Sequence, residues 1–481
     1  MKQILFSFLL VFISYLNAFS QHCNCEENFK WVKKTFEEND AGFNYALSIK
    51  GEAAYKKHND FYESKVKEIT DLDKCADVIY DWLTFFRKGH FYINIIQDSN
   101  EVTEKAIINT DNWEKYPISE EEFNKYLSKG KHEPLEGIWK TDPYTIGVIK
   151  TKSGYTGFIL DGGNTSWQKY EVKFKLNVTE PNSYGGTYYL RDYSEYKLNN
   201  IIQIGENTLQ IDNIFLYRVN PKLEDTKQIK SYLELIKANR PLMQQYSDST
   251  LVLRIPSFSN GYKREIDSVI AANHDKIIST PNLIIDIRNN GGGSDGSYSE
   301  IIPYLYTNPI RIVGMELLST TLNNKRMESY LDDPDITKKD KKEVQKSLKI
   351  LNDNLGKFVN LGDKKVYIQE LNTVYSYPKN VGILINKGNG STSEQFLLAA
   401  KQSSKTKLFG ATTAGVLDIS NMYYAISPSG DLKLGYCLSK SYRIPDMAID
   451  GKGILPDYYL DSEIPQSEWV QYAQDSFSKN K

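Results

Sequence analysis

Apolar and polar residues alternate along the chain in three distinct patterns. From residue 26 to residue 86, apolar residues recur at intervals of three and four, which is typical of amphipathic helices. This pattern ends at Arg87-Lys88-Gly89, and the apolar run 90–95 predicts a strand that begins at His90. The polar stretch 97–133 predicts a short helix between linkers.

The second pattern consists of short aromatic and β-branched segments separated by glycine-containing turns. It predicts a small all-β, barrel-like module over residues 134–220. The 34 tyrosines of the chain fit half-buried β-surfaces better than a helical bundle. The expected strands are 145–149, 155–160, 170–176, 186–191, 201–204 and 208–211.

In the third pattern, strands and helices alternate, which predicts an α/β core with a largely parallel sheet over residues 221–475. The chain is thus expected to comprise an N-terminal helical region (21–133), the inserted β-module and this core. In the core we expect strands at 251–255, 282–287 and 381–385, and helices at 228–238, 263–274, 297–306, 338–355 and 393–402.

The first 20 residues resemble an export signal. Lys2 precedes a short apolar run, and Ala18-Phe19-Ser20 places small residues before a predicted cleavage at Gln21. A membrane anchor is the alternative, but the run is short for a bilayer span. We therefore expect a secreted or periplasmic protein without a membrane span after signal removal. The formal net charge of -2 gives no indication of a nucleic-acid partner.

The four cysteines, Cys23, Cys25, Cys75 and Cys437, lack the context of a nucleophile or a zinc site. An oxidising compartment permits disulfides. A bond between Cys25 and Cys75 would tie the first helix to the helix before His90, although the sequence leaves open whether it forms. No metal or organic cofactor is implied.

Two glycine-containing turns carry the candidate chemistry. In the first, an apolar strand runs into Asn290-Gly291-Gly292-Gly293, where backbone amides could face an oxyanion or a phosphate. In the second, a buried strand ends at Gly388-Asn389-Gly390, and Ser391 precedes a helix that includes Glu394. Ser391 could be a nucleophile at a helix N-terminus, or Ser391 or Ser393 could simply cap that helix.

Together with Gly451-Lys452-Gly453-Ile454-Leu455-Pro456-Asp457, these turns resemble, in order, the motif series of the C-terminal processing (tail-specific) peptidases. The resemblance covers the last half of the chain and the His90 segment. It implies a crotonase/Clp-like core, Ser391 as the nucleophile, and the amides of Thr392 and Gly292 as the oxyanion hole. The implied substrate is a peptide or a protein.

The resemblance departs from the usual pattern at the general base. Val416 stands where bacterial members carry a lysine, which excludes a Ser–Lys dyad at that place. Lys88-Gly89-His90 instead resembles the histidine segment of the tricorn-core-like branch, which uses a serine, a histidine and an acid. By that resemblance His90 is the base and Asp450 the acid, with Asp446 and Glu394 as competitors.

The β-module lacks the carboxylate-binding loop of a PDZ domain, which many family members carry. The main interpretation is a serine endopeptidase that forms an acyl-enzyme at Ser391. Two alternatives remain open: a catalytically inactive ligand-binding protein on the same fold, and an esterase.

Overall fold

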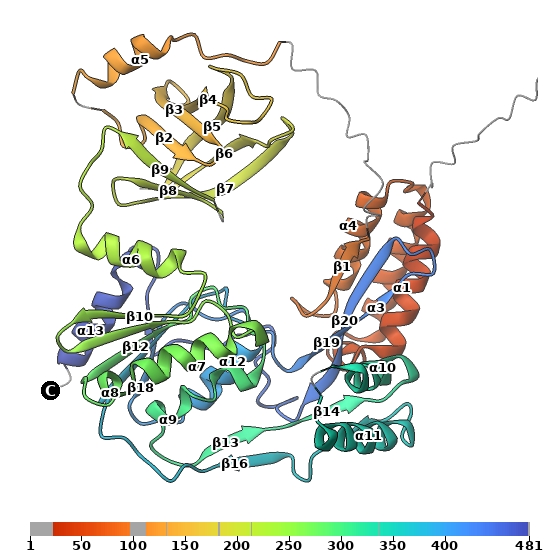
Figure 1. The fold of residues 1–481 in the computed structure, drawn as a ribbon. Coiled ribbons are helices and arrows are strands. Elements are labelled where there is room, and N and C mark those ends of the chain that lie inside the picture. Colours follow the sequence, from red (N-terminus) through yellow and green to blue (C-terminus); the bar gives the residue numbers. More distant parts are fainter. Residues whose placement is uncertain are drawn as a thin grey trace, which may run out of the picture.

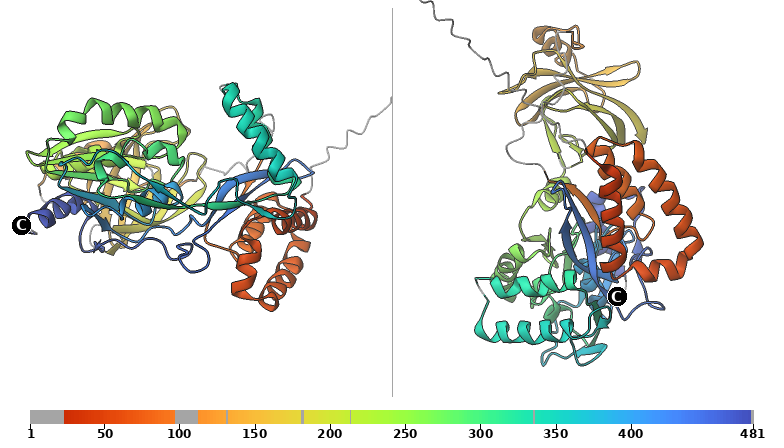
Figure 2. Two further views of the ribbon diagram at one scale, coloured as in Figure 1. Left: turned by 90° about the horizontal axis from the view of Figure 1, so that it is seen from below. Right: turned by 90° about the vertical axis from the view of Figure 1, so that its right-hand side faces the viewer.

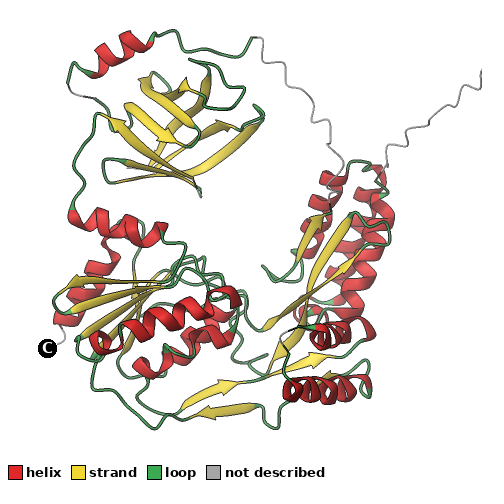
Figure 3. Ribbon diagram, in the orientation of Figure 1, coloured by secondary structure: helices red, strands yellow, loops and turns green. Residues whose placement is uncertain are grey.

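A computed structural model describes residues 23–96, 112–130, 132–180, 183–212, 214–334 and 336–479. The predicted export signal and its cleavage site lie outside these residues. Figure 1 shows three groups of elements: a barrel, a sheet with flanking helices below it, and a second sheet with helices beside that. Figure 3 shows that the barrel is built of strands, whereas helices flank both sheets.

The N-terminal helices pack on the second sheet. Their apolar faces meet in a core that includes Phe36 and Trp82, together with residues of the longest strand of that sheet. Polar caps define two of their starts, since Asn24 accepts from the amide of Glu27 and Asp71 from that of Lys74. The helices are α1 (Cys25–Asn39), α2 (Phe43–Lys50), α3 (Glu52–Lys65) and α4 (Leu72–Leu83).

A disulfide joins Cys25 of α1 to Cys75 of α4 across 50 residues of chain. Loop closure of that length stabilises the folded state by about 4 kcal/mol. We therefore expect the Cys25→Ser/Cys75→Ser protein to have a clearly lower urea midpoint. Cys23→Ser, at a free buried cysteine, is the control, and equal midpoints for all three proteins would contradict the prediction.

Eight strands close a barrel between the helical regions. Aromatic and aliphatic side chains fill its interior, and the buried Lys173 lies over the rings of Tyr144, Trp167 and Tyr188. Burial lowers the pKa of Lys173 to about 7. Helix α5 (Glu120–Leu127) precedes the barrel strands, which are β2 (Gly137–Thr141), β3 (Tyr144–Thr151), β4 (Gly154–Asp161), β5 (Val172–Glu180), β6 (Ser183–Tyr189), β7 (Glu195–Ile204), β8 (Thr208–Ile211) and β9 (Ile214–Asn220).

A six-stranded sheet forms the centre of the α/β part, in the order β10-β11-β12-β17-β18-β21. All neighbouring pairs are parallel except β10 with β11. Apolar cores lie on both of its faces. Its strands are β10 (Leu242–Ser247), β11 (Thr250–Arg254), β12 (Asn282–Asp286), β17 (Asn380–Ile385), β18 (Thr406–Gly410) and β21 (Tyr458–Tyr459), and its helices are α6 (Lys227–Lys237), α7 (Lys263–Ala272), α8 (His274–Ile277), α9 (Ile302–Leu305), α12 (Thr392–Ala400) and α13 (Trp469–Lys479).

The second sheet is antiparallel, and its central strand β20 pairs with β1, β14 and β19. Figure 2 shows the N-terminal helices beside this sheet. A two-stranded ladder, β13 (Ile310–Val313) with β16 (Val366–Gln369), runs along the lower edge of the molecule in Figure 1. The remaining elements are β1 (Tyr92–Ile95), β14 (Met315–Leu318), β15 (Phe358–Val359), β19 (Ile419–Ile426), β20 (Leu432–Ser441), α10 (Thr321–Ser329) and α11 (Lys338–Asn352).

The structure differs from the predicted elements at several places. The helix expected over 297–306 is reduced to the single turn α9, because Pro303 lacks an amide and fits only at a helix start. The strand expected from residue 90 begins at Tyr92, since His90 has a positive φ of 58°. The sequence did not predict several strands of the structure: the barrel strands β2 and β9, the strands β10, β18 and β21 of the six-stranded sheet, the ladder of β13 and β16, and β14, β15, β19 and β20 of the second sheet.

Candidate active site

The two glycine-containing turns meet because their strands are neighbours. β12 and β17 are parallel, with Asp286 opposite Leu384, so their carboxyl ends lie at the same edge of the sheet. Ligands of open α/β sheets bind at such an edge. Asp286 is fully buried and bonds the guanidinium groups of Arg288 and Arg254, which holds the end of β12 in place.

Hydrogen bonds among four asparagines hold the two turns together. The side chains of Asn289 and Asn386 bond one another at 2.9 Å, and the amide of Asn289 donates to Asn386 Oδ1. Asn389 Nδ2 donates to the carbonyl of Asn290 at 3.1 Å. The turns are therefore fixed by side-chain amides rather than by apolar packing alone.

Ser391 occupies a strained position at the start of α12. Its φ is 54° and its ψ is -125°, which is rare for a residue other than glycine. Its hydroxyl makes no capping bond to the helix, whereas the hydroxyl of Ser393 donates to the carbonyl of Asn290. Capping therefore does not account for Ser391, and strand, sharp turn and helix present its hydroxyl in the manner of a nucleophile elbow.

The predicted oxyanion donors lie directly beside Ser391. Within the described residues, no acceptor bonds the amide of Thr392, which is a free donor of the first helical turn. Gly292 has a φ of 107°, and a Cβ added to it would lie 2.8 Å from Ser391 Cβ and 2.9 Å from the nitrogen of Thr392. The amide of Gly292, however, donates to Asn290 Oδ1 at 3.0 Å.

His90 lies two residues before strand β1 of the second sheet, and the carbonyl of Ile419 fixes its ring. The Nδ1 atom lies 2.7 Å from the oxygen of Ile419. Because a carbonyl only accepts, Nδ1 carries the proton in the neutral ring and Nε2 keeps its lone pair. The structure thus holds His90 in the tautomer that a general base requires.

The segment 413–419 bridges the serine and the histidine. The amide of Ser391 donates to the carbonyl of Val416 at 3.0 Å, and the side chain of Val416 packs against Gly89 and Gly390. These glycines directly precede His90 and Ser391. Both catalytic candidates are described residues, and no hydrogen bond joins their side chains in this structure.

The predicted acids support this bridge and do not bond His90. Asp450 accepts from the amides of Leu417, Asp418 and Ile419 at 2.6, 2.7 and 3.1 Å. Glu394 accepts from the amides of Gly415 and Val416 and from the hydroxyl of Thr413. Asp446 is exposed.

Two groups that the sequence did not indicate also act on this site. The carbonyl of Ile419 takes the place expected for the acid, and a backbone atom leaves no signal in the sequence. Arg87 donates to the carbonyls of Gly89 and His90 at 3.0 and 2.8 Å and forms a buried, two-point ion pair with Asp40. The sequence indicates Arg87 only as part of the end of a helical pattern.

The pKa of His90 is lowered, first by burial and then by the positive charge of Arg87, although the hydrogen bond to the carbonyl of Ile419 and the charges of Asp450 and Asp40 raise it. A neutral imidazole is the active form of a base. Labelling by a fluorophosphonate should therefore rise with pH through a midpoint below about 6.5, the ordinary value for histidine.

Arg87→Gln removes the charge that opposes protonation of His90, so we expect the midpoint of this pH profile to move upward. Arg87→Lys, which keeps the charge, is the matched control and should move it less. Rates at each pH are compared for protein that retains its native thermal transition. A midpoint equal to that of the wild type in Arg87→Gln would contradict the assigned electrostatic role.

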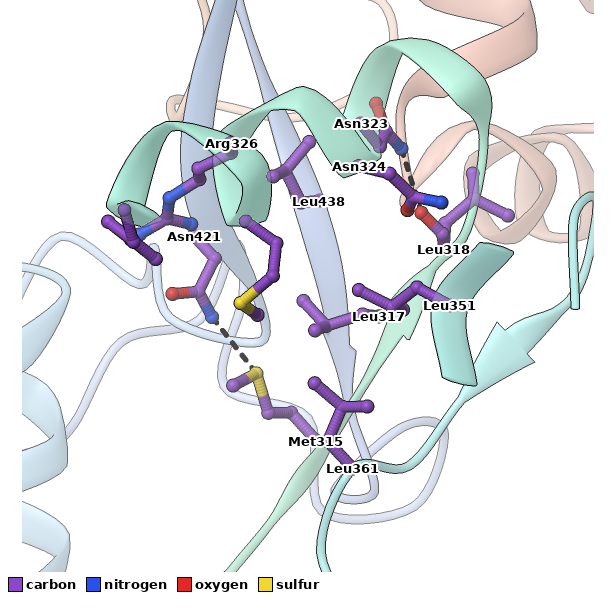
Figure 4. Close-up of a pocket in the computed structure, with 12 residues that line it drawn as sticks. Met315, Leu317, Leu318, Asn323, Asn324, Arg326, Leu351, Leu361, Asn421 and Leu438 are labelled. Carbon is purple, nitrogen blue, oxygen red and sulfur yellow. Dashed lines mark hydrogen bonds between the residues drawn. The ribbon is translucent and has the colours of Figure 1, made fainter. Parts of the chain in front are cut away.

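A separate cavity of about 190 Å³ lies among β14, α10 and α11 (Figure 4). Its lining is mainly leucine and methionine, with Arg326 and Asn421 at one side, and none of the predicted site residues lines it. Within the described ranges, no group of three or more histidine, cysteine, aspartate or glutamate side chains could hold a metal ion.

Comparison with known proteins gives the class of the protein. Residues 249–460 match the model of peptidase family S41. Mature CPAF in complex with lactacystin is similar over 94% of this chain and 97% of its own, with a TM-score of 0.51 and 12% identity. Mature CPAF by itself gives 0.50 and 12% over 94% and 96%. No curated protein matches the sequence.

The structural similarity to CPAF shows a shared mixed α/β fold. The class of reaction is indicated by the family match and not by this similarity. The chain contains a peptidase family S41 domain, which confirms the resemblance to the C-terminal processing peptidases. It is a serine-type peptidase by class, and members of such a family act on peptides or proteins. Among the described residues, no helix has the length and apolarity needed to cross a membrane.

Proposed function

We propose that the protein is a secreted serine endopeptidase that forms an acyl-enzyme at Ser391 with His90 as its general base. The observation that carries the proposal is the strained Ser391, whose hydroxyl is not used as a cap and lies beside the free amide of Thr392. Attack by Ser391 Oγ on a carbonyl carbon would transfer the hydroxyl proton to His90 Nε2 and place negative charge on the carbonyl oxygen.

In this proposal the oxyanion is held by Thr392 and by the glycine run. Gly292 is the donor expected from the sequence, and its backbone lies so close to Ser391 and Thr392 that an added Cβ would not fit, which supports that role. Its amide would have to exchange Asn290 Oδ1 for the oxyanion when substrate binds. His90 would then return its proton to the leaving amine, and water would release the acyl group.

The finer architecture belongs to the same proposal. The parallel sheet and its helices would correspond to the crotonase/Clp-like core, and the barrel to a module inserted before it. The site would follow the serine–histidine branch, with Asp450 acting on His90 through the segment 417–419. The predicted export signal and the disulfide between Cys25 and Cys75 support a secreted or periplasmic location.

Labelling with a fluorophosphonate probe tests the nucleophile without knowledge of the substrate. Wild type and Ser393→Ala should be labelled, because Ser393 is buried and already hydrogen-bonded, whereas Ser391→Ala should not. The proposal would be overturned if Ser391→Ala were labelled at the rate of the wild type. It would also be overturned if neither the wild type nor Ser391→Ala were labelled, and either result would favour a binding protein. An ester and peptide panel then separates an esterase from a peptidase.

A further inference from the structure

The outer edge of β19 leads directly to His90. β19 pairs with β20, and no other described strand pairs with it. At its first residue, Ile419, the carbonyl bonds His90 Nδ1 and the amide bonds Asp450. Because both groups of Ile419 are used there, they point away from β20 and toward this edge.

The hydrogen-bond pattern shows which further residues face the same edge. Cys437 lies opposite Met422, and its amide and carbonyl are bonded by Asp40 and Ala41, away from β19. Ser427, by contrast, donates to the carbonyl of Leu432 on β20. Backbone groups alternate between the two sides of a strand, so Met422, Tyr424 and Ile426 direct their amides and carbonyls outward.

A left-handed residue connects the two ends of this edge. Asn421 has a φ of 59°, and its side chain donates to Ser439 Oγ of β20 at 2.9 Å. Along β19, backbone groups alternately face β20 and the outer edge, and the turn at Asn421 offsets this alternation by one residue. Ile419 therefore faces the outer edge before the turn, and Met422, Tyr424 and Ile426 face it after the turn. We term Met422, Tyr424 and Ile426 the free edge, because both backbone groups of Ile419 are already bonded. Tyr424 and Ile426 are 43% and 52% exposed.

None of the described residues bonds the backbone groups of Met422, Tyr424 and Ile426 on this edge. Unpaired edge groups of this kind are templates for an added strand. A peptidase needs its substrate extended across the nucleophile, and here the edge begins at the carbonyl that orients the base. Continuity with the site therefore identifies an extended polypeptide as the occupant.

We propose that the free edge of β19 binds substrate as an added β-strand and leads it to His90 and Ser391. This inference rests on the proposed peptidase function and specifies its substrate class. Recognition by backbone groups is independent of side-chain sequence, so the substrate is an unfolded or flexible segment long enough to pair from Met422 to Ile426. A compact folded domain cannot offer such a strand.

Hydrogen exchange of the full-length Ser391→Ala protein, with and without β-casein as an unfolded probe, tests the inference. The amides of Met422, Tyr424 and Ile426 should exchange at least about tenfold more slowly in the complex, as expected for one added hydrogen bond each. Tyr423 and Ala425, whose amides already face β20, should not change and are internal controls. Unchanged exchange at the three outward amides, or no binding of β-casein, would overturn the inference.

A second measurement uses proline to remove one outward donor. Tyr424→Pro should weaken β-casein binding to the Ser391→Ala protein about tenfold, because proline lacks the amide and is tolerated only where no ladder bond is lost. Tyr424→Thr keeps the amide and should stay within about threefold. Equal losses in both variants would refute backbone pairing.

The two proposals fail differently. If the wild type reacts with a fluorophosphonate but β-casein does not protect the β19 amides of the Ser391→Ala protein, the proposed function stands and the strand-binding inference fails. If β-casein protects these amides but the wild type never reacts with the probe, the strand-binding inference stands and the proposed chemistry fails.

Discussion

His90→Ala should react with a fluorophosphonate on the order of 10⁴-fold more slowly than wild type at neutral pH, because no other group would accept the proton of Ser391. The pairing of Nδ1 with the carbonyl of Ile419 is the reason for assigning this role, since it leaves Nε2 free to act. The second-order rate constant for labelling gives the measurement without a known substrate.

His274→Ala is the matched control for His90. The ring of His274 bonds the hydroxyl of Tyr304 and lies outside the site, so its loss should leave the labelling rate close to that of wild type. If His90→Ala were as reactive as His274→Ala, a base other than His90 would have to activate Ser391.

Asp450→Asn should lower the labelling rate about 100-fold through misplacement of His90. The carboxylate of Asp450 accepts three consecutive amides, and an asparagine would turn an N–H donor toward at least one of them. The carbonyl of Ile419 would then shift, and the ring of His90 would lose its fixed tautomer. Rates are measured on protein with a native thermal transition.

Asp446→Asn is the control for Asp450, because its carboxylate is exposed. A loss as large as that of His90→Ala in Asp450→Asn would indicate direct contact between Asp450 and His90 during the reaction. An unchanged rate would show that the segment 417–419 keeps its position without the carboxylate, and would contradict the positioning role.

The sequence pattern was sufficient to predict those parts of the site whose structure depends only on residues that are close together in the chain. The glycines around Gly292 and the serine at Ser391 follow apolar runs, and both runs are buried strands with sharp turns after them. The helix after Ser391 begins where its sequence predicts. Such turns depend on the conformational freedom of a few residues, which the sequence displays directly.

Residue types with several possible partners were predicted less well. Asp450 was identified as functionally important, but its partners are the amides of residues 417–419 and not His90. The approach of Arg87 to the carbonyl of His90 depends on the ion pair with Asp40, 47 residues earlier. Carboxylates and guanidinium groups bind any suitable donor or acceptor, so only folding selects among them.

The sequence by itself determined the peptidase class, the position of Ser391 and the absence of a lysine at Val416, because these depend on residue identity at fixed spacing. The tertiary structure alone decided that the carbonyl of Ile419 orients His90 and that β19 has a free edge. Both are properties of backbone atoms, which are chemically alike in every residue. Their roles arise only from the position that the fold gives them.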